Sequence, residues 1–205
     1  MFRSSSGLSS VLAVLASLAF ASCAEEDPRL AYEGTQYLGG VYGNGPVSSS
    51  APVDTVSYWD GEGVPGKPSI RISLGEQRAY FYKGGQLVGI SQLSTGQEGR
   101  VTPAGQYKIT QKDPDHASSR YGDYVDANDN VVVPNIDNQL DPKPPGAHYK
   151  GAPMPYYMQI APGFGMHAGY LPGYPASHGC IRMPEFMAVN FYKSVSVGTP
   201  VTISE

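Results

Sequence analysis

The sequence predicts a mainly β domain with one or two short helices and a long capping loop. The 205-residue chain holds 25 glycines and 18 prolines, a composition that is typical of turns and disfavours long helices. Its 15 tyrosines suit the pleated, half-buried surface of a sheet. Several short segments alternate apolar and polar residues, whereas only one segment has the apolar spacing of an amphipathic helix.

The first predicted strands lie between residues 69 and 93. Ile70, Ile72 and Leu74 alternate with polar residues, which is the period of a half-buried strand. Residues 79–82 and 87–93 flank a Gly-Gly pair that is typical of a hairpin turn. We therefore expect a β-meander here, and further strands at residues 106–111, 131–133, 156–161, 164–167 and 199–204.

One helix is expected near the end of the chain. Pro184 suits a first helical turn, and Gly198 and Pro200 disfavour continuation of the helix. Between them one helical face would carry the apolar side chains of Met187, Ala188, Phe191, Tyr192 and Val195.

The segment from Asp113 to Pro155 is the predicted capping loop. It is rich in Asp, Asn, Pro and Gly, and it is too long for a simple connection in a compact domain. Because it precedes the candidate site residues, we expect a lid or substrate-binding loop. His116 and His148 lie within it, and we expect both to be solvated.

The N-terminal 22 residues resemble a lipoprotein signal peptide. Arg3 supplies positive charge, residues 11–20 are an apolar run too short for a comfortable membrane span, and small residues lead into Cys23. Lipidation at Cys23 would anchor the mature chain to a membrane on its extracytoplasmic side. An ordinary signal peptide cleaved near Ala21 or Ser22, with an incidental cysteine, is the alternative. Residues 23–67, rich in Gly, Ser and Pro, are expected to form a flexible tether to a catalytic domain at residues 68–205.

The charge balance argues against nucleic acid as a partner. The formal net charge is −4, so the chain lacks the basic field that attracts phosphate backbones.

Cysteine usage directs attention to Cys180. The chain has two cysteines, and an acylated Cys23 cannot pair with Cys180. The mature domain would then carry a lone thiol in a compartment that favours disulfides. Cys180 is either a small buried hydrophobe or a nucleophile, and its neighbours bear on this choice.

The residues around Cys180 favour a nucleophile. His178 and Arg182 lie two positions before and after it, so an extended backbone would place all three side chains on one face. Histidine, positive charge and a helix N-terminus each lower a thiol pKa, and all three are candidates here. Gly179 would let a substrate carbonyl approach the backbone amides, as an oxyanion site requires. His167, at the end of a short predicted strand, would supply a base from a separate element.

Two other interpretations of these residues fit the sequence less well. Zinc binding by His167, His178 and Cys180 lacks a fourth ligand at any usual spacing, so no metal is expected. An inert cysteine beside core histidines fits poorly with the Gly- and Pro-rich composition of this segment.

The motifs closely resemble those of the L,D-transpeptidase catalytic domain, also called the YkuD domain. The signature is an upstream histidine, here in MHAG at residues 166–169, followed by a Ser/Thr-His-Gly-Cys core, here in ASHGCIRM at residues 176–183. Residues 74–80, 94–96 and 102–107 resemble the family's opening strands and its Thr-Pro-x-Gly turn. The resemblance covers roughly residues 68–204.

This resemblance implies a β-sandwich-like fold with the cysteine in a cleft under a variable loop. Cys180 would attack the carbonyl between the L-centre and the following D-residue of a peptidoglycan stem peptide, forming a thioester. An amine of a second stem or of a protein acceptor would then take the acyl group. His167 corresponds to the base, although the residues leave His178 open for that role. No cofactor is implied.

The other site residues also have implied roles. Ser177 and His178 would support the site, the amides of Gly179 and Cys180 would hold the oxyanion, and Arg182 would bind the donor's carboxylate or tune the site. Hydrolysis of the same thioester and a non-catalytic wall-binding lipoprotein are the alternative functions. Ala24 after the acylated cysteine indicates the outer membrane of a two-membrane bacterium.

Overall fold

The computed structural model describes residues 53–205. The predicted signal peptide, the predicted lipidation site at Cys23 and most of the predicted tether lie outside the described residues. Within residues 53–205, no helix is both long and apolar enough to cross a membrane.

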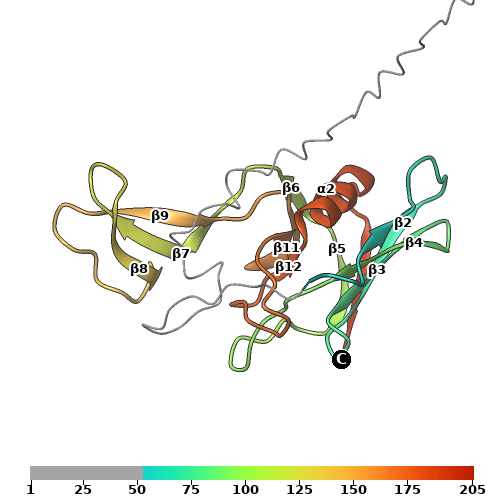
Figure 1. Cartoon of the computed structure of the whole chain (residues 1–205), viewed down its shortest axis with the longest axis horizontal. Coiled ribbons are helices and arrows are strands. Elements are labelled where there is room, and N and C mark those ends of the chain that lie inside the picture. The colour runs from blue at the N-terminus through green and yellow to red at the C-terminus, as the bar shows by residue number, and fades with distance from the viewer. Residues whose placement is uncertain (1–52) are drawn as a thin grey trace, which may run out of the picture.

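The expectation of a mainly β domain with few helices is confirmed. Residues 53–205 form three sheets of six, four and three strands, together with one helix, α2 (Glu185–Ser194). Figure 1 shows the six-stranded sheet at one end, the four-stranded sheet and α2 in the middle, and the three-stranded sheet projecting at the other end.

The six-stranded sheet contains the predicted meander. The predicted Gly-Gly turn joins β3 to β4, and positive φ angles of 57° at Gly84 and 87° at Gly85 explain why glycine is needed there. Strand order is β1-β4-β3-β2-β13-β5, with only β13 and β2 parallel. The bounds are β1 (Tyr58–Trp59), β2 (Pro68–Ser73), β3 (Arg78–Lys83), β4 (Gln86–Gln92), β5 (Gly105–Lys108) and β13 (Pro200–Ser204).

Part of the predicted tether is folded onto this sheet. Strand β1 lies within residues 23–67 and pairs with the edge of β4, where Trp59 lies opposite Gly89. The Trp59 ring packs edge-on against Phe81, with 5.0 Å between ring centroids. Partial burial of this indole against the main core explains why residues 58 and 59 join the domain instead of forming a free linker.

The single strand predicted at residues 106–111 is two strands in the structure. Strand β5 pairs with β13 in the six-stranded sheet, whereas β6 (Gln111–Asp113) pairs with β10 in the four-stranded sheet. The chain changes sheets at the two residues between them. Ile109 donates its amide to Thr199, and Thr110 donates its amide to Gln159. Because Tyr107 and Ile109 alternate with polar residues up to this crossing, the pattern alone predicts one strand.

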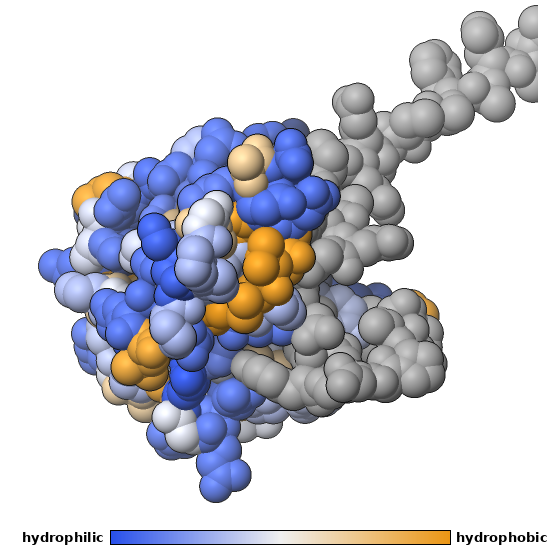
Figure 2. All heavy atoms as spheres, turned by 90° about the vertical axis from the view of Figure 1, so that its left-hand side faces the viewer, coloured by the Kyte–Doolittle hydropathy of each residue, from blue (hydrophilic) through white to orange (hydrophobic). Residues whose placement is uncertain are grey.

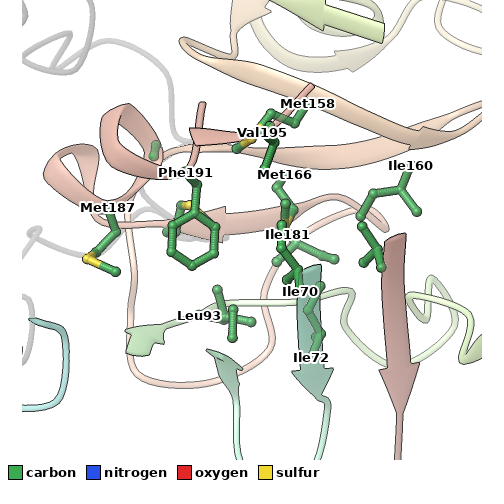
Figure 3. Close-up of a cluster of buried hydrophobic side chains, with 14 of the residues drawn as sticks. Ile70, Ile72, Leu93, Met158, Ile160, Met166, Ile181, Met187, Phe191 and Val195 are labelled. Carbon is green, nitrogen blue, oxygen red and sulfur yellow. The ribbon is translucent and has the colours of Figure 1, made fainter. Parts of the chain in front are cut away.

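The four-stranded sheet faces the six-stranded sheet across the main core. Its order is β12-β11-β10-β6, with bounds β10 (Tyr157–Ala161), β11 (Phe164–Ala168) and β12 (Ile181–Met183). Ile72 from one sheet, Met166 from the other and Phe191 from α2 are all fully buried in one cluster (Figure 3). The helix buries Met187, Ala188 and Phe191, as its predicted stripe requires.

The predicted capping loop is a sheet rather than an irregular loop. Residues 113–155 contain β7 (Ala117–Val125), β8 (Val131–Asp137) and β9 (His148–Pro153), in the order β8-β7-β9. Tyr124, Ile136 and Ala147 form a small core for it. Figure 2, which looks onto this end of the molecule, shows a largely hydrophilic surface with small apolar patches.

Candidate active site

Two neighbouring parallel strands bring the predicted nucleophile and base together. Strand β11 carries His167, strand β12 begins directly after Cys180, and His167 lies opposite Arg182 in the pairing. One step back in the same register, Gly165 adjoins Cys180, and its backbone amide acts to lower the pKa of the thiol. Residues two apart on a strand share a face, so His167 lies on the same face as Gly165. Cys180 and His167 are both buried.

The hydroxyl of Ser177 shapes the backbone around the thiol. Its Oγ donates to the carbonyl of Cys180 and accepts the amide of Gly179 at 3.1 Å. Gly179 has φ +117°, a conformation that side chains rarely tolerate, which explains the glycine before the cysteine. The Gly179 amide, predicted to hold an oxyanion, is therefore already engaged. Among the described residues, no acceptor is seen for the amide of Cys180.

A second segment, residues 94–102, holds this backbone from outside. Ser94 and Arg182 exchange two backbone hydrogen bonds of 3.0 and 2.9 Å. The Oγ1 of Thr102 donates to the carbonyl of Gly179 at 2.8 Å and accepts the amide of Gly96 at 2.9 Å. Thr102 is fully buried. The Thr-Pro-x-Gly turn that the sequence singled out thus directly contacts residues 177–180, which carry the predicted nucleophile and are called the nucleophile loop below.

His167 is held as a neutral imidazole with a free acceptor nitrogen. Its Nδ1 lies 2.8 Å from the carbonyl of Ala168, which can only accept, so Nδ1 carries the proton. The Nε2 atom is buried and has no hydrogen-bond partner among the described residues. Burial, foremost, lowers the pKa of His167 to about 4, and the charge of Arg182 acts in the same direction. At neutral pH the imidazole is therefore unprotonated at Nε2, and this nitrogen can act as an acceptor.

Cys180 differs from the activated thiolate that its neighbours suggested. Burial raises the pKa of the thiol and outweighs the lowering effects of the Gly165 amide and the Arg182 charge. Neighbouring charge does act as expected, but desolvation of the thiolate is the larger effect. Cys180 therefore rests as a thiol that needs a base.

Arg182 lies inside the site rather than on its surface. Its side chain is 1% exposed, and its stem packs over Gly169, where a methyl group would lie 3.2 Å from the Arg182 Cγ atom. Its charge lowers the pKa values of His167, His178 and Cys180.

His178 stacks under a residue that the sequence did not single out. The rings of His178 and Tyr121 are 4.4 Å apart and inclined by 19°, and Tyr121 comes from β7. Burial, followed by the charges of Arg100 and Arg182, lowers the pKa of His178 to about 4. Tyr121 and Arg100 escaped notice because their roles arise only when the three-stranded sheet meets the site.

On the β10 side, Tyr157 and His116 approach the thiol and the base. Tyr157 is 4% exposed, and burial together with the charge of Cys180 raises its pKa. The ring of His116 stacks on Tyr157 at 4.2 Å, so His116 is not simply solvated. The expectation for His148 is met, because its side chain is 55% exposed.

Within residues 53–205, no group of three or more His, Cys, Asp or Glu side chains is arranged to hold a metal ion. The fold and the site define a mainly β domain with a buried thiol and a neutral imidazole on adjacent parallel strands.

The chain belongs to the L,D-transpeptidase catalytic domain family, whose YkuD model matches residues 67–203. No curated protein sequence matches the chain. Similar solved structures are an L,D-transpeptidase from Mycobacterium smegmatis, 17% identical with a TM-score of 0.51, and a cysteine-to-serine mutant of the Enterococcus faecium L,D-transpeptidase, 23% identical with a TM-score of 0.51. Each alignment covers 68% of this chain, but only 59% and 50% of those chains, respectively. At these identities the likeness shows a shared fold.

Proposed function

We propose that this protein is a peptidoglycan L,D-transpeptidase in which Cys180 is the nucleophile and His167 the base. The observation that carries this proposal is the buried Nε2 atom of His167. It has no hydrogen-bond partner among the described residues, and it belongs to the strand beside Cys180. A buried nitrogen that accepts no hydrogen bond carries a cost in folding free energy. The proposed reaction explains this cost, because the thiol would supply the missing donor.

The first half of the reaction forms a thioester. The Cys180 thiol gives its proton to Nε2 of His167 as the sulfur attacks the carbonyl carbon of the donor stem peptide. Collapse of the tetrahedral intermediate breaks the carbon–nitrogen bond after the L-centre, and the leaving amine takes the proton from His167. In the second half, an acceptor amine from a stem peptide or a protein attacks the thioester and gives a proton to His167. The carbon–sulfur bond then breaks, and His167 returns the proton to the Cys180 sulfur.

The oxyanion in this proposal forms its bond with the amide of Cys180. The Gly179 amide is used by Ser177, so Gly179 instead contributes the backbone turn that leaves the next amide free. Ser177 and His178 support this geometry without exchanging protons with the substrate. Arg182 acts through its charge, which favours the thiolate during attack.

Covalent inhibition tests the nucleophile and the base. A carbapenem should open its β-lactam ring on the Cys180 sulfur and add one intact inhibitor mass to the protein. Cys180→Ala should abolish the adduct, and an adduct in that variant would overturn the assignment. His167→Gln should slow acylation by ~10²-fold or more, the usual effect of a positioned base. His148→Gln, a matched change at an exposed histidine, should have no effect, whereas an equal loss in His178→Gln would transfer the base role there.

Product analysis tests the fate of the thioester. The protein should be incubated with muropeptides that carry tetrapeptide stems, and the products should be identified by mass spectrometry. Crosslinked dimers are the expected result. Shortened stems alone would indicate hydrolysis by water instead of transfer, and unchanged substrate would contradict both reactions.

We also propose that the enzyme is anchored to the periplasmic face of the outer membrane by a lipid on Cys23. A labelled fatty acid should be incorporated into the chain in cells and lost in Cys23→Ser. Incorporation that persists in this variant would contradict the anchor, and cell fractionation would identify the membrane.

A further inference from the structure

Two arginines meet at the Tyr121 ring above the site. The guanidinium carbons of Arg100 and Arg120 each lie 5.2 Å from the ring centroid, and Nη1 of Arg100 donates to the Tyr121 hydroxyl at 2.7 Å. The same ring stacks on His178, two residues before Cys180. Two positive charges therefore gather beside the nucleophile loop, on a ring that is part of the site.

These two arginines differ in how far their charge is neutralised. Arg120 is paired with Asp137, with its Nε and Nη2 atoms 2.9 and 2.8 Å from one carboxylate oxygen. Arg100 has no carboxylate at ion-pair distance within residues 53–205, and its side chain is partly exposed. A guanidinium group has five N–H donors, and the Tyr121 hydroxyl occupies one of those of Arg100. Arg100 therefore retains its positive charge, and its remaining N–H donors can bind an anion.

The backbone on both sides of this cluster is fixed. In β7, the pairing register shifts between Ala117 and Gly122, and the bulge presents residues 120 and 121 to the site. The hydroxyl of Tyr149 closes this bulge, because it lies 2.7 and 2.8 Å from the carbonyl oxygens of Ser118 and Tyr121 and shares its one hydrogen between them. A bulge that is fixed by a hydrogen bond orients the side chains of residues 120 and 121 in one direction.

The Arg100 segment is fixed by a close backbone contact. A methyl group added to Gly96 would lie 2.1 Å from the Arg100 carbonyl oxygen, so the loop folds back tightly on itself. The amide of Arg100 donates to the carbonyl of Gln97 at 2.9 Å and closes this turn. The guanidinium group therefore projects from a defined position instead of a flexible loop.

We propose that Arg100, supported by Tyr121 and Arg120, forms a carboxylate-binding subsite that selects stem peptides with a free carboxyl group. This inference rests on the proposed function and names the feature of the donor that the site recognises. The planar fork of arginine matches the two oxygens of a carboxylate. Arg182, which the sequence suggested for this role, is 1% exposed, whereas Arg100 is accessible.

Equilibrium binding tests the subsite without turnover. The full chain with Cys180→Ala should be titrated by calorimetry with a tetrapeptide stem, and with versions in which one carboxyl group at a time is converted to an amide. One of these amides should bind about 10-fold or more weakly, since a hydrogen-bonded charge pair has an effect of this size. In Arg100→Gln the acid should bind as weakly as that amide. The identity of the sensitive amide reports which carboxylate is bound.

Three variants separate recognition from structural damage. Arg100→Lys keeps the charge and should retain part of the preference for the acid. Tyr121→Phe keeps the stacked ring but removes the hydroxyl that holds Arg100, and should weaken the preference less than Arg100→Gln does. Arg71→Gln, which removes an exposed arginine on β2, should leave binding unchanged. Equal weakening of every peptide by Arg100→Gln, including the fully amidated one, would overturn the subsite.

The wild-type chain and Arg100→Gln, both with Cys180 intact, distinguish the two proposals when thioester formation is measured beside the binding test. If Cys180 forms a thioester with all donors regardless of Arg100, the proposed function stands and the subsite is refuted. If no thioester forms, yet binding of the acid depends on Arg100, the subsite stands and the proposed function is refuted.

Discussion

Acid should destabilise this domain through His167, and the size of the effect follows from its burial. The folded chain holds the pKa of His167 at about 4, because burial disfavours the charged imidazolium, whereas the ordinary value is 6.5. The unfolded chain therefore takes up a proton near pH 6.5, and the folded chain does so only near pH 4. Between these values the unfolded state binds more protons, so the free energy of unfolding falls as the pH falls.

The difference between the two pKa values corresponds to roughly 3 kcal/mol, of which about 2 kcal/mol is lost by pH 5. This is a large part of the free energy of unfolding of an ordinary domain, which is about 5 to 15 kcal/mol. Carboxylates with lowered pKa values, such as Asp137, add their own acid sensitivity, so wild type alone does not isolate the histidine.

The assay is urea unfolding at about pH 7.5 and about pH 5, in wild type, His167→Gln and His148→Gln. Glutamine cannot take up the proton, so His167→Gln should lose about 2 kcal/mol less than wild type between the two conditions. His148→Gln changes an exposed histidine and should follow wild type. Parallel losses in wild type and His167→Gln would refute the reasoning that a buried neutral imidazole resists protonation.

Other substitutions test the packing and the site. Ser177→Ala should reduce the free energy of unfolding by about 2 kcal/mol and slow acylation by a carbapenem, because the Gly179 amide loses its buried partner; wild-type values for both would contradict this role. Phe191→Ala should cost about 3 to 5 kcal/mol in urea unfolding, since the ring is fully buried, and a loss below about 1 kcal/mol would mean that it is not part of the core. Tyr149→Phe should slow acylation while α2 and the main core persist, as judged by circular dichroism; an unchanged acylation rate would show that the bulge does not affect the site.

The sequence predicted those elements whose packing has a simple period. Ile70 and Ile72 alternate toward one core, and Met187 and Phe191 follow one helical face, so β2 and α2 lie where they were expected. In the three-stranded sheet, the strand predicted at residues 131–133 is part of β8, but β7 and β9 were not predicted, because they contain glycines that normally indicate loops. A methyl group on Gly122 or Gly151 would lie 2.1 Å from a backbone carbonyl of the neighbouring strand, so these glycines permit close strand contact.

The site likewise has features that the sequence predicted and features that it could not predict. Cys180 and its histidines stand in a short motif, which the sequence displays directly. The resting state of the thiol was not predictable, because the pKa depends on burial by distant residues as well as on neighbours in sequence. A hydrogen bond joins Arg100 to Tyr121, 21 positions later in the sequence, and no local sequence pattern predicts such a pair.

The hydrogen bonds between residues 94–102 and the nucleophile loop also determine at which stage of folding the site forms. The bond from Ser94 to the carbonyl of Tyr174 spans 80 positions, and that from Thr102 to Gly179 spans 77. Closing loops of this length costs chain entropy, and other contacts must offset this cost before these hydrogen bonds can stabilise the folded state. Such long-range contacts are typical of slow-folding β proteins. The backbone around Cys180 therefore takes shape only after most of the domain has folded. A partly folded chain therefore carries the thiol without the backbone arrangement that surrounds it in the folded domain.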